Sequence, residues 1–382
     1  MDFSLNDEQE AIRNLCHEFG QEVIAPRAEE MDRTASFPYD IVEQMANLGL
    51  LGIPFPEKYG GAGADTVSYA LAVEEIGRAD ASTGITMAAH ISLGASPFYL
   101  FGSEEQKQEY LVPLAQGKRL WAFGLTEPEA GSDAANAKTR AELKDGSWAV
   151  NGSKSFITNS GTKMTGGVTV TAVTGKREDG RSEISNIIIP SGTPGFTVES
   201  SYRKMGWKAS DTHGLSFHDC SVPEENLLGE RGKGLQQFLQ ILDGGRISVA
   251  ALSVGLAQAC YDAAFAYATQ RRQFGQPISK FQAIQFKLAD MATEIELSRL
   301  MTLKAAWQKD QGKDFRQAAG MAKLYATETC KRAADQAVQI HGGYGFMDDY
   351  AVSRYYRDCK VHEIGEGTSE VQRGLIAKLL GC

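Results

Sequence analysis

The sequence predicts an α+β protein of three consecutive domains: an α-helical N-terminal domain over residues 1–118, a middle β-barrel or β-sandwich domain over 119–228, and a C-terminal four-helix bundle over 229–382. Three observations lead to this prediction. Apolar residues recur at helical spacing towards both ends of the chain. Runs of β-branched residues between Gly and Pro turns fill the middle. Strands do not alternate with helices as they do in a parallel α/β fold.

Helical signals dominate the N-terminal part. Asn6 is a candidate N-cap, with Gln9 as its capping-box partner. One apolar helix face then follows, at Ile12, Leu15, Cys16, Phe19 and Val23. Pro26 is expected to end or kink this helix. A second helix is expected over residues 39–48, and Asp65 is a candidate cap for a third.

The middle part has the residue pattern of strands. Asn151-Gly152 is a two-residue hairpin signal, with residues 148–150 on one side and 156–158 on the other. Residues 168–174 and 187–190 are rich in Val, Ile and Thr and are expected to be strands. Turns recur at short spacing, which predicts a small barrel or sandwich.

The C-terminal part returns to helix. Long helical stretches are expected near 235–270, 281–311 and 315–341, which suggests a bundle. The most apolar long stretch, residues 247–267, contains polar residues such as Asp262. It therefore predicts a buried helix of a folded core and not a membrane span.

Composition excludes several classes of protein. The 382 residues carry 39 Lys and Arg against 48 Asp and Glu, so the formal net charge is 39 − 48 = −9, which argues against a general nucleic-acid binder. The six cysteines include no C-x-x-C pair. The chain opens on an acidic, polar stretch without a signal or transit peptide, so we expect a bacterial cytoplasmic protein. A mitochondrial matrix protein whose transit peptide has been removed would look the same.

Motifs for metals and nucleotides are missing from the sequence. There is no phosphate-loop motif, no complete Rossmann fingerprint and no H-E-x-x-H zinc motif. His213 and His218 lie five residues apart in the β region and could form a metal pair, but polar loop residues are the simpler interpretation. We therefore expect no metal site.

Three polar segments combine residue types that suit binding or catalysis. Residues 125–133 place small and hydroxyl residues where backbone amides can approach a ligand closely. Residues 151–159 offer an aromatic face beside a hydroxyl donor. Residues 363–373 place the carboxylate of Glu366 between two glycines, which suits an exposed or strained base on a loop before a helix. Each segment alone could be an ordinary turn, hairpin or acidic helix start.

Together, and in this order, the three segments resemble the acyl-CoA dehydrogenase family. Further matches to that family lie at residues 243–246, 271–275, 281–285 and 338–343. The resemblance covers nearly the whole chain and looks closest to the short-chain (butyryl-type) and related branched or alicyclic bacterial branches. It implies the same three domains that periodicity predicts.

The resemblance implies a non-covalently bound FAD between the middle domain and the bundle. The positions that match flavin contacts are Phe123, Leu125, Thr126, Ser132, Phe156, Ile157, Thr158, Thr368 and Glu370. Many relatives carry Trp at the position of Phe156. The positions that match contacts to the ADP half, across a subunit boundary, are Arg271, Phe274, Gln282, Gln339, Gly342 and Gly343. A shared cofactor implies an oligomer, in this family usually a homotetramer built as a dimer of dimers.

The reaction that the resemblance implies is α,β-dehydrogenation of an acyl-CoA thioester. Glu366 matches the catalytic base that removes the α proton while the β hydride goes to flavin N5. Desolvation by the acyl chain should raise the pKa of this glutamate towards working pH. The positions that match substrate or CoA contacts are Ser132, Asp243, Arg246 and Gly367. Arg246 could equally be a structural arginine.

Two glycines distinguish this chain from other branches of the family. The isovaleryl-type branch carries its base as a glutamate just before the arginine of the 243–246 segment, whereas this chain has Gly245 there and keeps Glu366. Gly365 stands where many straight-chain enzymes have Tyr. Loss of that ring should widen the cavity and admit branched or alicyclic acyl groups.

Electron-transfer flavoprotein is the electron acceptor that the resemblance implies. An oxygen-using acyl-CoA oxidase is less favoured, since those enzymes are much longer. Flavin monooxygenase relatives lose the glutamate that Glu366 preserves. A non-enzymatic flavin- or CoA-binding protein is a further alternative. Ring desaturation of a cyclohexane- or cyclohexene-carboxyl-CoA, including 1,4-elimination, stays open within the dehydrogenase class.

Overall fold

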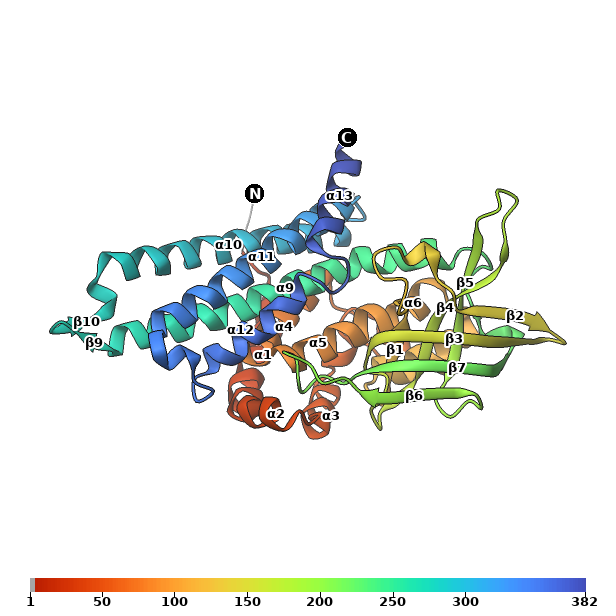
Figure 1. The fold of residues 1–382 in the computed structure, drawn as a ribbon, viewed down its shortest axis with the longest axis horizontal. Coiled ribbons are helices and arrows are strands. Elements are labelled where there is room, and N and C mark those ends of the chain that lie inside the picture. Colours follow the sequence, from red (N-terminus) through yellow and green to blue (C-terminus); the bar gives the residue numbers. More distant parts are fainter. Residues whose placement is uncertain (1–3) are drawn as a thin grey trace.

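The computed structural model describes residues 4–382, and its N-terminal part is helical (Figure 1). The predicted capping box is present, because the side chains of Asn6 and Gln9 each accept from the other's backbone N–H. Pro26 does not end the chain of helical turns; α1 passes through a π-helical turn and a 3-10 turn into α2. Asp65 caps α4, as predicted, by accepting from Ser68 N–H at 2.7 Å. The helices are α1 (Asp7–Phe19), α2 (Ala28–Thr34), α3 (Tyr39–Asn47), α4 (Thr66–Ala79), α5 (Ala81–Ala89), α6 (Ser96–Phe101), α7 (Glu104–Gln106) and α8 (Val112–Ala115).

The middle part is an eight-stranded sheet in the order β6-β7-β3-β2-β4-β5-β8, with β1 parallel to β4. A single ladder pair, Arg140 with Val173, joins β2 to β4, so the sheet consists of two wings. Residues of both wings, such as Val150 and Ile187, share one apolar core, as in the predicted barrel or sandwich. The strands are β1 (Leu120–Gly124), β2 (Arg140–Lys144), β3 (Ser147–Thr158), β4 (Thr165–Lys176), β5 (Ser182–Pro190), β6 (Phe196–Ser201), β7 (Thr212–Pro223) and β8 (Leu227–Leu228).

The predicted hairpin turn at Asn151-Gly152 is wrong, because β3 runs through it without interruption. The Asn151 amide donates to the Asp219 carboxylate at 3.0 Å, and the Asp219 N–H donates back to Asn151 Oδ1 at 2.8 Å. This exchange accompanies a register shift between β3 and β7. The hairpin turn lies instead between β2 and β3, at Asp145-Gly146, both with positive φ. Asn-Gly here marks an irregularity within a strand.

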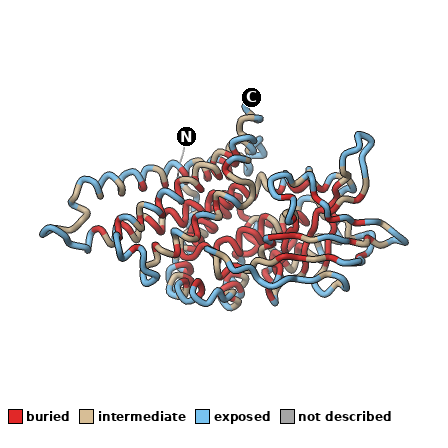
Figure 2. Tube along the Cα trace, viewed as in Figure 1, coloured by how far each residue is buried: buried red, intermediate tan, exposed pale blue. Residues whose placement is uncertain are grey.

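The C-terminal part confirms the three long helices predicted for it. Among residues 4–382, α9 is the one helix long and apolar enough to cross a membrane, but most of its apolar window is buried inside the protein, as in a core helix. Figure 2 shows buried residues concentrated along α9 and where it meets α4 and α5. The elements are α9 (Gly234–Gln270), β9 (Arg272–Gln273), β10 (Gln276–Pro277), α10 (Gln282–Asp310), α11 (Arg316–His341), α12 (Ala351–His362) and α13 (Ser369–Leu380).

The two helical parts share one apolar core, whereas the sheet has its own. Ile76 of α4, Leu252 of α9 and Ala326 of α11 belong to the same buried cluster. Asp310, the last residue of α10, accepts from the backbone N–H groups of Thr66 and Val67 and so helps to cap α4. Helices distant in the sequence therefore pack around α9. The end of α10, where the loop to α11 begins, lies against the start of α4.

Candidate active site

Glu366 lies on the loop between α12 and α13 in a strained backbone conformation. Its φ is +52°, and the next residue, Gly367, has φ of +95°. A non-glycine residue in the left-handed region costs of order 1 kcal/mol, and such residues cluster at active sites. Gln372 of α13 donates its amide to the carbonyls of Glu366 (3.2 Å) and Gly367 (3.1 Å), and Lys323 of α11 donates to the Gly367 carbonyl at 2.7 Å. Side chains from two helices thus hold this backbone.

The Glu366 carboxylate is buried and has no hydrogen-bond partner within residues 4–382. Burial raises its pKa to about 7, an effect that the positive charges of Lys323 and Arg246 partly oppose. A carboxylate that titrates near neutral pH, with free lone pairs, has the properties of a general base. The side chain predicted to be the base therefore has a suitable environment.

Helix α9 faces this carboxylate with a glycine. A Cβ added to Gly245 would lie 2.0 Å from Glu366 Oε2, so a side chain there and the Glu366 carboxylate in this position exclude each other. The next residue, Arg246, is buried and forms an ion pair with Asp243. Burial lowers the pKa of Arg246 despite this partner, and its Nε has no hydrogen-bond partner. The predicted substrate residues Asp243 and Arg246 are thus brought next to Glu366.

A cavity of about 620 Å³ opens beside this part of α9. Asp243 lines it, one helical turn from Arg246. Leu239 gives it an apolar wall, and the cations Arg177, Lys313 and Arg316 line it, of which Arg316 is paired with Asp314 at 2.6 Å. The cavity therefore combines apolar and cationic walls, which suits a ligand with an apolar part and an anionic part.

The predicted flavin-edge residues of the middle part gather at the ends of β1 and β3. Phe156 is 66% exposed with φ of +63°, and its ring lies 5.3 Å from that of Tyr202. Thr158 is half-buried, whereas Ile157 is buried in the core of the sheet, so only its backbone can face a ligand. Phe123 is also buried, and its ring packs 4.9 Å from that of Phe238 on α9. Leu125 and Thr126 are half-buried and Ser132 is exposed on the loop that follows.

A buried ion pair that the sequence analysis missed supports this loop. Lys154 of β3 is 1% exposed and lies 2.7 Å from the Glu127 carboxylate. It also donates to the carbonyl of Leu125 at 3.1 Å. The pair therefore ties the two segments of the predicted flavin edge together. Glu127 lies in the polar segment 125–133 and Lys154 in the segment 151–159, and this position was the sequence signal for their role.

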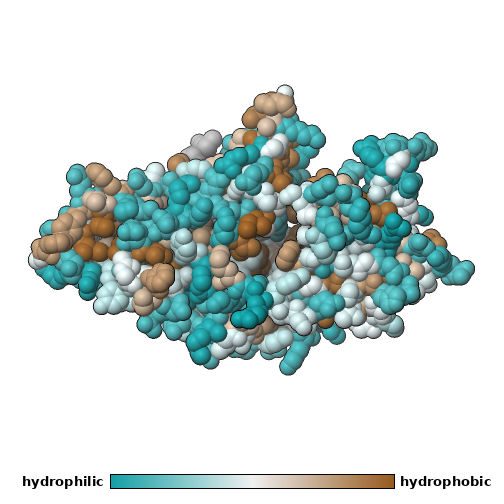
Figure 3. Space-filling model, in the orientation of Figure 1, coloured by the Kyte–Doolittle hydropathy of each residue, from teal (hydrophilic) through white to brown (hydrophobic). Residues whose placement is uncertain are grey.

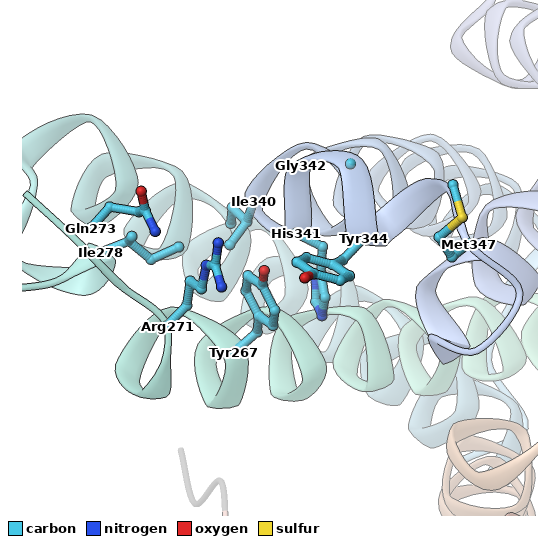
Figure 4. Close-up of a pocket in the computed structure, with 10 residues that line it drawn as sticks. Tyr267, Arg271, Gln273, Ile278, Ile340, His341, Gly342, Tyr344 and Met347 are labelled. Carbon is cyan, nitrogen blue, oxygen red and sulfur yellow. The ribbon is translucent and has the colours of Figure 1, made fainter.

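The residues predicted to bind the ADP half lie at the opposite end of the bundle, where β9 and β10 project (Figure 1). Arg271, Gly342 and Gly343 line a cavity of about 550 Å³ there, and the Arg271 guanidinium lies 5.5 Å from the Tyr344 ring (Figure 4). Phe274 is 92% exposed, in a region where apolar side chains gather on the surface (Figure 3). Gln282 and Gln339 are exposed nearby, at the start of α10 and the end of α11.

This group has the chemistry that a nucleotide requires. Arg271 lines this cavity and forms no ion pair within residues 4–382, so its guanidinium is available for an anion. Nothing lies within 4 Å of a Cβ added to Gly342 or Gly343, so the backbone is open to close approach. One chain does not bring this group together with β3, which carries Phe156, because the length of the bundle separates β9 and β10 from the sheet (Figure 1).

The remaining predicted cofactor residues lie after Glu366. Thr368 is the N-cap of α13 and accepts from Val371 N–H at 3.3 Å. Glu370 is exposed, and hydrogen bonds with its own backbone N–H and then with Thr368 lower its pKa. Both side chains therefore have a local role at the start of α13.

The histidines have structural partners. His213 lies 2.8 Å from the Asp211 carboxylate and 2.6 Å from the Glu199 carbonyl, while His218 is exposed. No group of three or more metal-ligating side chains occurs in the part of the chain that the structure describes. His90 is buried against the Leu114 carbonyl, and burial lowers its pKa to about 4. His341 stacks on Tyr267 at 4.2 Å, beside the Arg271 cavity.

Known proteins match the chain over its whole length. Family models for the N-terminal, middle and C-terminal domains of acyl-CoA dehydrogenases match residues 6–118, 122–220 and 232–381. A probable acyl-CoA dehydrogenase of Bacillus subtilis, YngJ, is 56% identical over 100% of both chains. Butyryl-CoA dehydrogenase of Megasphaera elsdenii is 44% identical, with a TM-score of 0.97 over 100% of both chains.

A third match bears on the electron acceptor. A chain solved in work on the electron transferring flavoprotein of Acidaminococcus fermentans is 46% identical, with a TM-score of 0.96 over 100% of this chain and 99% of that one. An acyl-CoA dehydrogenase complexed with FAD is also among the similar structures. The chain belongs to the acyl-CoA dehydrogenase family and is an FAD-binding oxidoreductase.

Proposed function

We propose that this enzyme oxidises a short acyl-CoA thioester to the α,β-enoyl-CoA, with Glu366 as the base that removes the α proton. The observation that carries the proposal is the Glu366 carboxylate itself, which is buried, lacks a hydrogen-bond partner and has a pKa of about 7. Hydrogen-bond donors inside the protein would stabilise the ionised carboxylate, lower its pKa and make it a weaker base. This one is ready to accept a proton from a bound molecule.

The proton transfer needs a substrate carbon beside Glu366. The α C–H bond breaks, its proton goes to a Glu366 oxygen, and the electron pair enters the developing double bond. FAD, when bound, supplies the acceptor for the hydride that leaves the β carbon. Donors at the thioester oxygen must stabilise the charge that develops there. The backbone N–H of Glu366 is a candidate, because the left-handed conformation fixes its direction.

The residues that we propose to contact the substrate lie around this carboxylate. Gly245 leaves the surface of α9 flat where the acyl chain must pass. Gly367, where an added Cβ would lie 2.8 Å from Gln372 Nε2, is the position that we propose to face the thioester. Asp243 lines the cavity of about 620 Å³ that the CoA moiety would enter, and Arg246 forms an ion pair with it from the same face of α9. Ser132, on an exposed loop of the middle domain, would contact the same ligand.

FAD would be held by two groups of residues from different subunits. The flavin edge would lie against Phe123, Leu125, Thr126, Phe156, Ile157, Thr158, Ser132, Thr368 and Glu370. The ADP half would contact the bundle end of a partner subunit, through Arg271, Phe274, Gln282, Gln339, Gly342 and Gly343. Because the two groups lie far apart in one chain, we propose an obligate oligomer, a homotetramer built as a dimer of dimers.

Domain limits near residues 118 and 228 remain a prediction.

Electron-transfer flavoprotein is the acceptor that we propose. The matching chain from work on the Acidaminococcus flavoprotein supports it. The Bacillus relatives support a bacterial cytoplasmic location. Oxidation by oxygen is the alternative, and rapid loss of the reduced flavin absorbance spectrum in air would favour it.

Gly365 favours branched or alicyclic thioesters as a second candidate substrate class. A Cβ added there meets only the Val361 carbonyl within 4 Å, at 3.5 Å, so this position has space that a larger residue would fill. The similarity to butyryl-CoA dehydrogenase and to short-chain enzymes favours a short straight chain. Desaturation of the ring of an alicyclic acyl-CoA is a special case of the branched or alicyclic substrate class.

The test is anaerobic bleaching of the bound yellow flavin by a panel of thioesters. The panel holds butyryl-, octanoyl-, isobutyryl-, 2-methylbutyryl-, cyclohexanecarboxyl- and cyclohex-1-ene-carboxyl-CoA. Fast bleaching by butyryl-CoA alone would assign the straight chain, and selective bleaching by a branched or ring thioester would assign the second class. Glu366→Gln should keep the flavin but stop bleaching by every member. If that variant bleaches at the normal rate, Glu366 is not the base.

A further inference from the structure

Lys323 is a buried lysine without a carboxylate at its ammonium group. It lies on α11 and is 0% exposed. Within residues 4–382 its Nζ donates to the Gly367 carbonyl at 2.7 Å and forms no ion pair. Burying an ammonium group costs several kcal/mol unless a negative charge compensates. The acidic groups that act on Lys323 are Glu366 first, followed by Glu363 and Glu370.

We infer that Lys323 is the positioning residue of the base: its ammonium is the countercharge that keeps Glu366 ionised when substrate excludes water, and its bond to Gly367 holds the loop in its left-handed conformation. The inference rests on the proposed role of Glu366. It goes beyond that role by assigning a source for the charge balance of the site. Lys323 need not touch the substrate for this.

The two actions of Lys323 have separate physical causes. The bond to the Gly367 carbonyl joins Gln372 in fixing two successive positive-φ residues, which would otherwise relax. The charge acts through space on a carboxylate that accepts no hydrogen bond within residues 4–382. Because no donor neutralises Glu366 directly, a nearby cation has an unusually large influence on its ionisation.

The other charged and titratable groups near Glu366 are few. Arg246 on α9 also favours the ionised carboxylate, but its guanidinium is already paired with Asp243. Tyr69 of α4 is buried, and burial raises its pKa, so it is neutral at working pH. Burial lowers the pKa of Lys323 itself to about 8, so Lys323 is still protonated at neutral pH. Lys323 is therefore the nearby cation without a competing ion pair.

The experiment compares Lys323→Gln, which keeps a donor but loses the charge, with Lys323→Met, which loses both. Lys331→Met is the matched control, since Lys331 lies on the same helix but is exposed, and the carboxylate within its reach is Glu363, at 4.0 Å, and not Glu366. The rate of anaerobic flavin reduction by butyryl-CoA, or by whichever thioester bleaches the enzyme, is measured against pH in the holoenzyme. The protonated carboxyl band of Glu366 is followed by infrared difference spectroscopy with Glu366→Gln as the blank, which requires no turnover.

Both Lys323 variants should raise the pKa of Glu366 by about one unit or more, because an opposite charge nearby is lost. Reduction near pH 6 should then be about tenfold slower and should recover at high pH in Lys323→Gln. Lys323→Met should also have a lower maximal rate. Lys331→Met should match the wild type.

An unchanged pKa of Glu366 in Lys323→Gln would overturn the inference while leaving the proposed function intact. Failure of Glu366→Gln to stop reduction would instead overturn the proposed function. If Lys323→Met does not fold, Lys323→Gln alone decides, because its infrared titration measures the carboxyl directly.

Discussion

Two buried lysines, Lys154 in the sheet and Lys323 in the bundle, solve the same electrostatic problem differently. Lys154 lies 2.7 Å from the Glu127 carboxylate and is also bonded to the Leu125 carbonyl and the Thr171 hydroxyl. Lys323 has one backbone carbonyl, and the carboxylate it acts on most strongly, Glu366, accepts no hydrogen bond within residues 4–382. A direct ion pair fixes structure, whereas a pair kept apart leaves the carboxylate free to react.

The largest effect should come from breaking the direct pair. Lys154→Met leaves the Glu127 carboxylate buried without its cation, which should lower the free energy of unfolding by about 3–5 kcal/mol. Urea unfolding at fixed protein concentration measures it. Adding Glu127→Gln to the same chain should recover part of the loss. A loss below about 1 kcal/mol would mean that the pair is not a structural link.

The next effect concerns the pH dependence of stability, which should have opposite signs for the two carboxylates. The folded pKa of Glu366, about 7, lies above its ordinary value of 4.5, so its contribution to stability is full below pH 4.5 and is lost as pH rises through 7. The loss is about 3.5 kcal/mol, because the two pKa values differ by about 2.5 and each whole number of that difference corresponds to about 1.4 kcal/mol. The difference in unfolding free energy between wild type and Glu366→Gln, measured from pH 4 to 8, isolates it.

Glu127 provides the contrast for that titration. Burial raises its pKa, but Lys154 and the surrounding N–H donors outweigh burial and hold the net pKa below the usual value. Its contribution is therefore present above pH 4.5 and lost as pH falls through the lower folded pKa. A Glu127→Gln reference should show this reversed slope. Parallel slopes for the two carboxylates would contradict the distinction between them.

A smaller effect should follow from filling the space beside the free carboxylate. Gly245→Ala places a methyl group where Glu366 Oε2 lies, so the carboxylate must move. The rate of flavin reduction should fall about 10–100-fold, or about 1.4–2.7 kcal/mol. Stability should change little, because the preference of alanine over glycine in a helix, up to about 1 kcal/mol, offsets the cost of displacing the carboxylate. Gly244→Ala, one residue earlier, is the control, since its Cβ meets no atom closer than 3.6 Å. Equal rates in both variants would contradict the contact.

The smallest effect sharpens the account of the direct pair. Thr171→Val removes the longest contact of Lys154, at 3.3 Å, together with the 3.4 Å bond from the Thr171 hydroxyl to the Gly124 carbonyl, and keeps the shape of the side chain. The free energy of unfolding should fall by about 0.5–1.5 kcal/mol, well below the Lys154→Met effect. Flavin content should be unaffected. An effect as large as that of Lys154→Met would mean that the hydroxyl, and not Glu127, satisfies the lysine.

Local signals were reliable where the structure depends on neighbours in sequence. The caps at Asn6 and Asp65 were predicted correctly, because a cap needs only the next helical turn. The Asn151-Gly152 turn was wrong, because the partner that decides its conformation, Asp219, lies on another strand. The resemblance identifies Glu366, and the structure adds the burial of its carboxylate and its strained backbone.

Lys323 and Gln372 could not be predicted from the sequence. Each lies within a helical stretch, and its role arises because α11 and α13 converge on the loop at Glu366. Periodicity identifies a buried face but does not say which buried side chain reaches another element. Glu127 and Lys154 lay within recognised segments, yet only the folded sheet shows that they pair.

The uninterrupted helix α9 sets the distance between the two groups of residues that we propose to bind the cofactor. Its 37 residues extend about 55 Å, from the edge of the sheet to the Arg271 cavity. A helix of that length keeps the flavin-edge residues of one chain away from the ADP-binding residues of the same chain. Each group can then complete a cofactor site only with a neighbouring chain. Under the proposed function, dissociation into single chains would release the cofactor, so flavin fluorescence on dilution would report assembly directly.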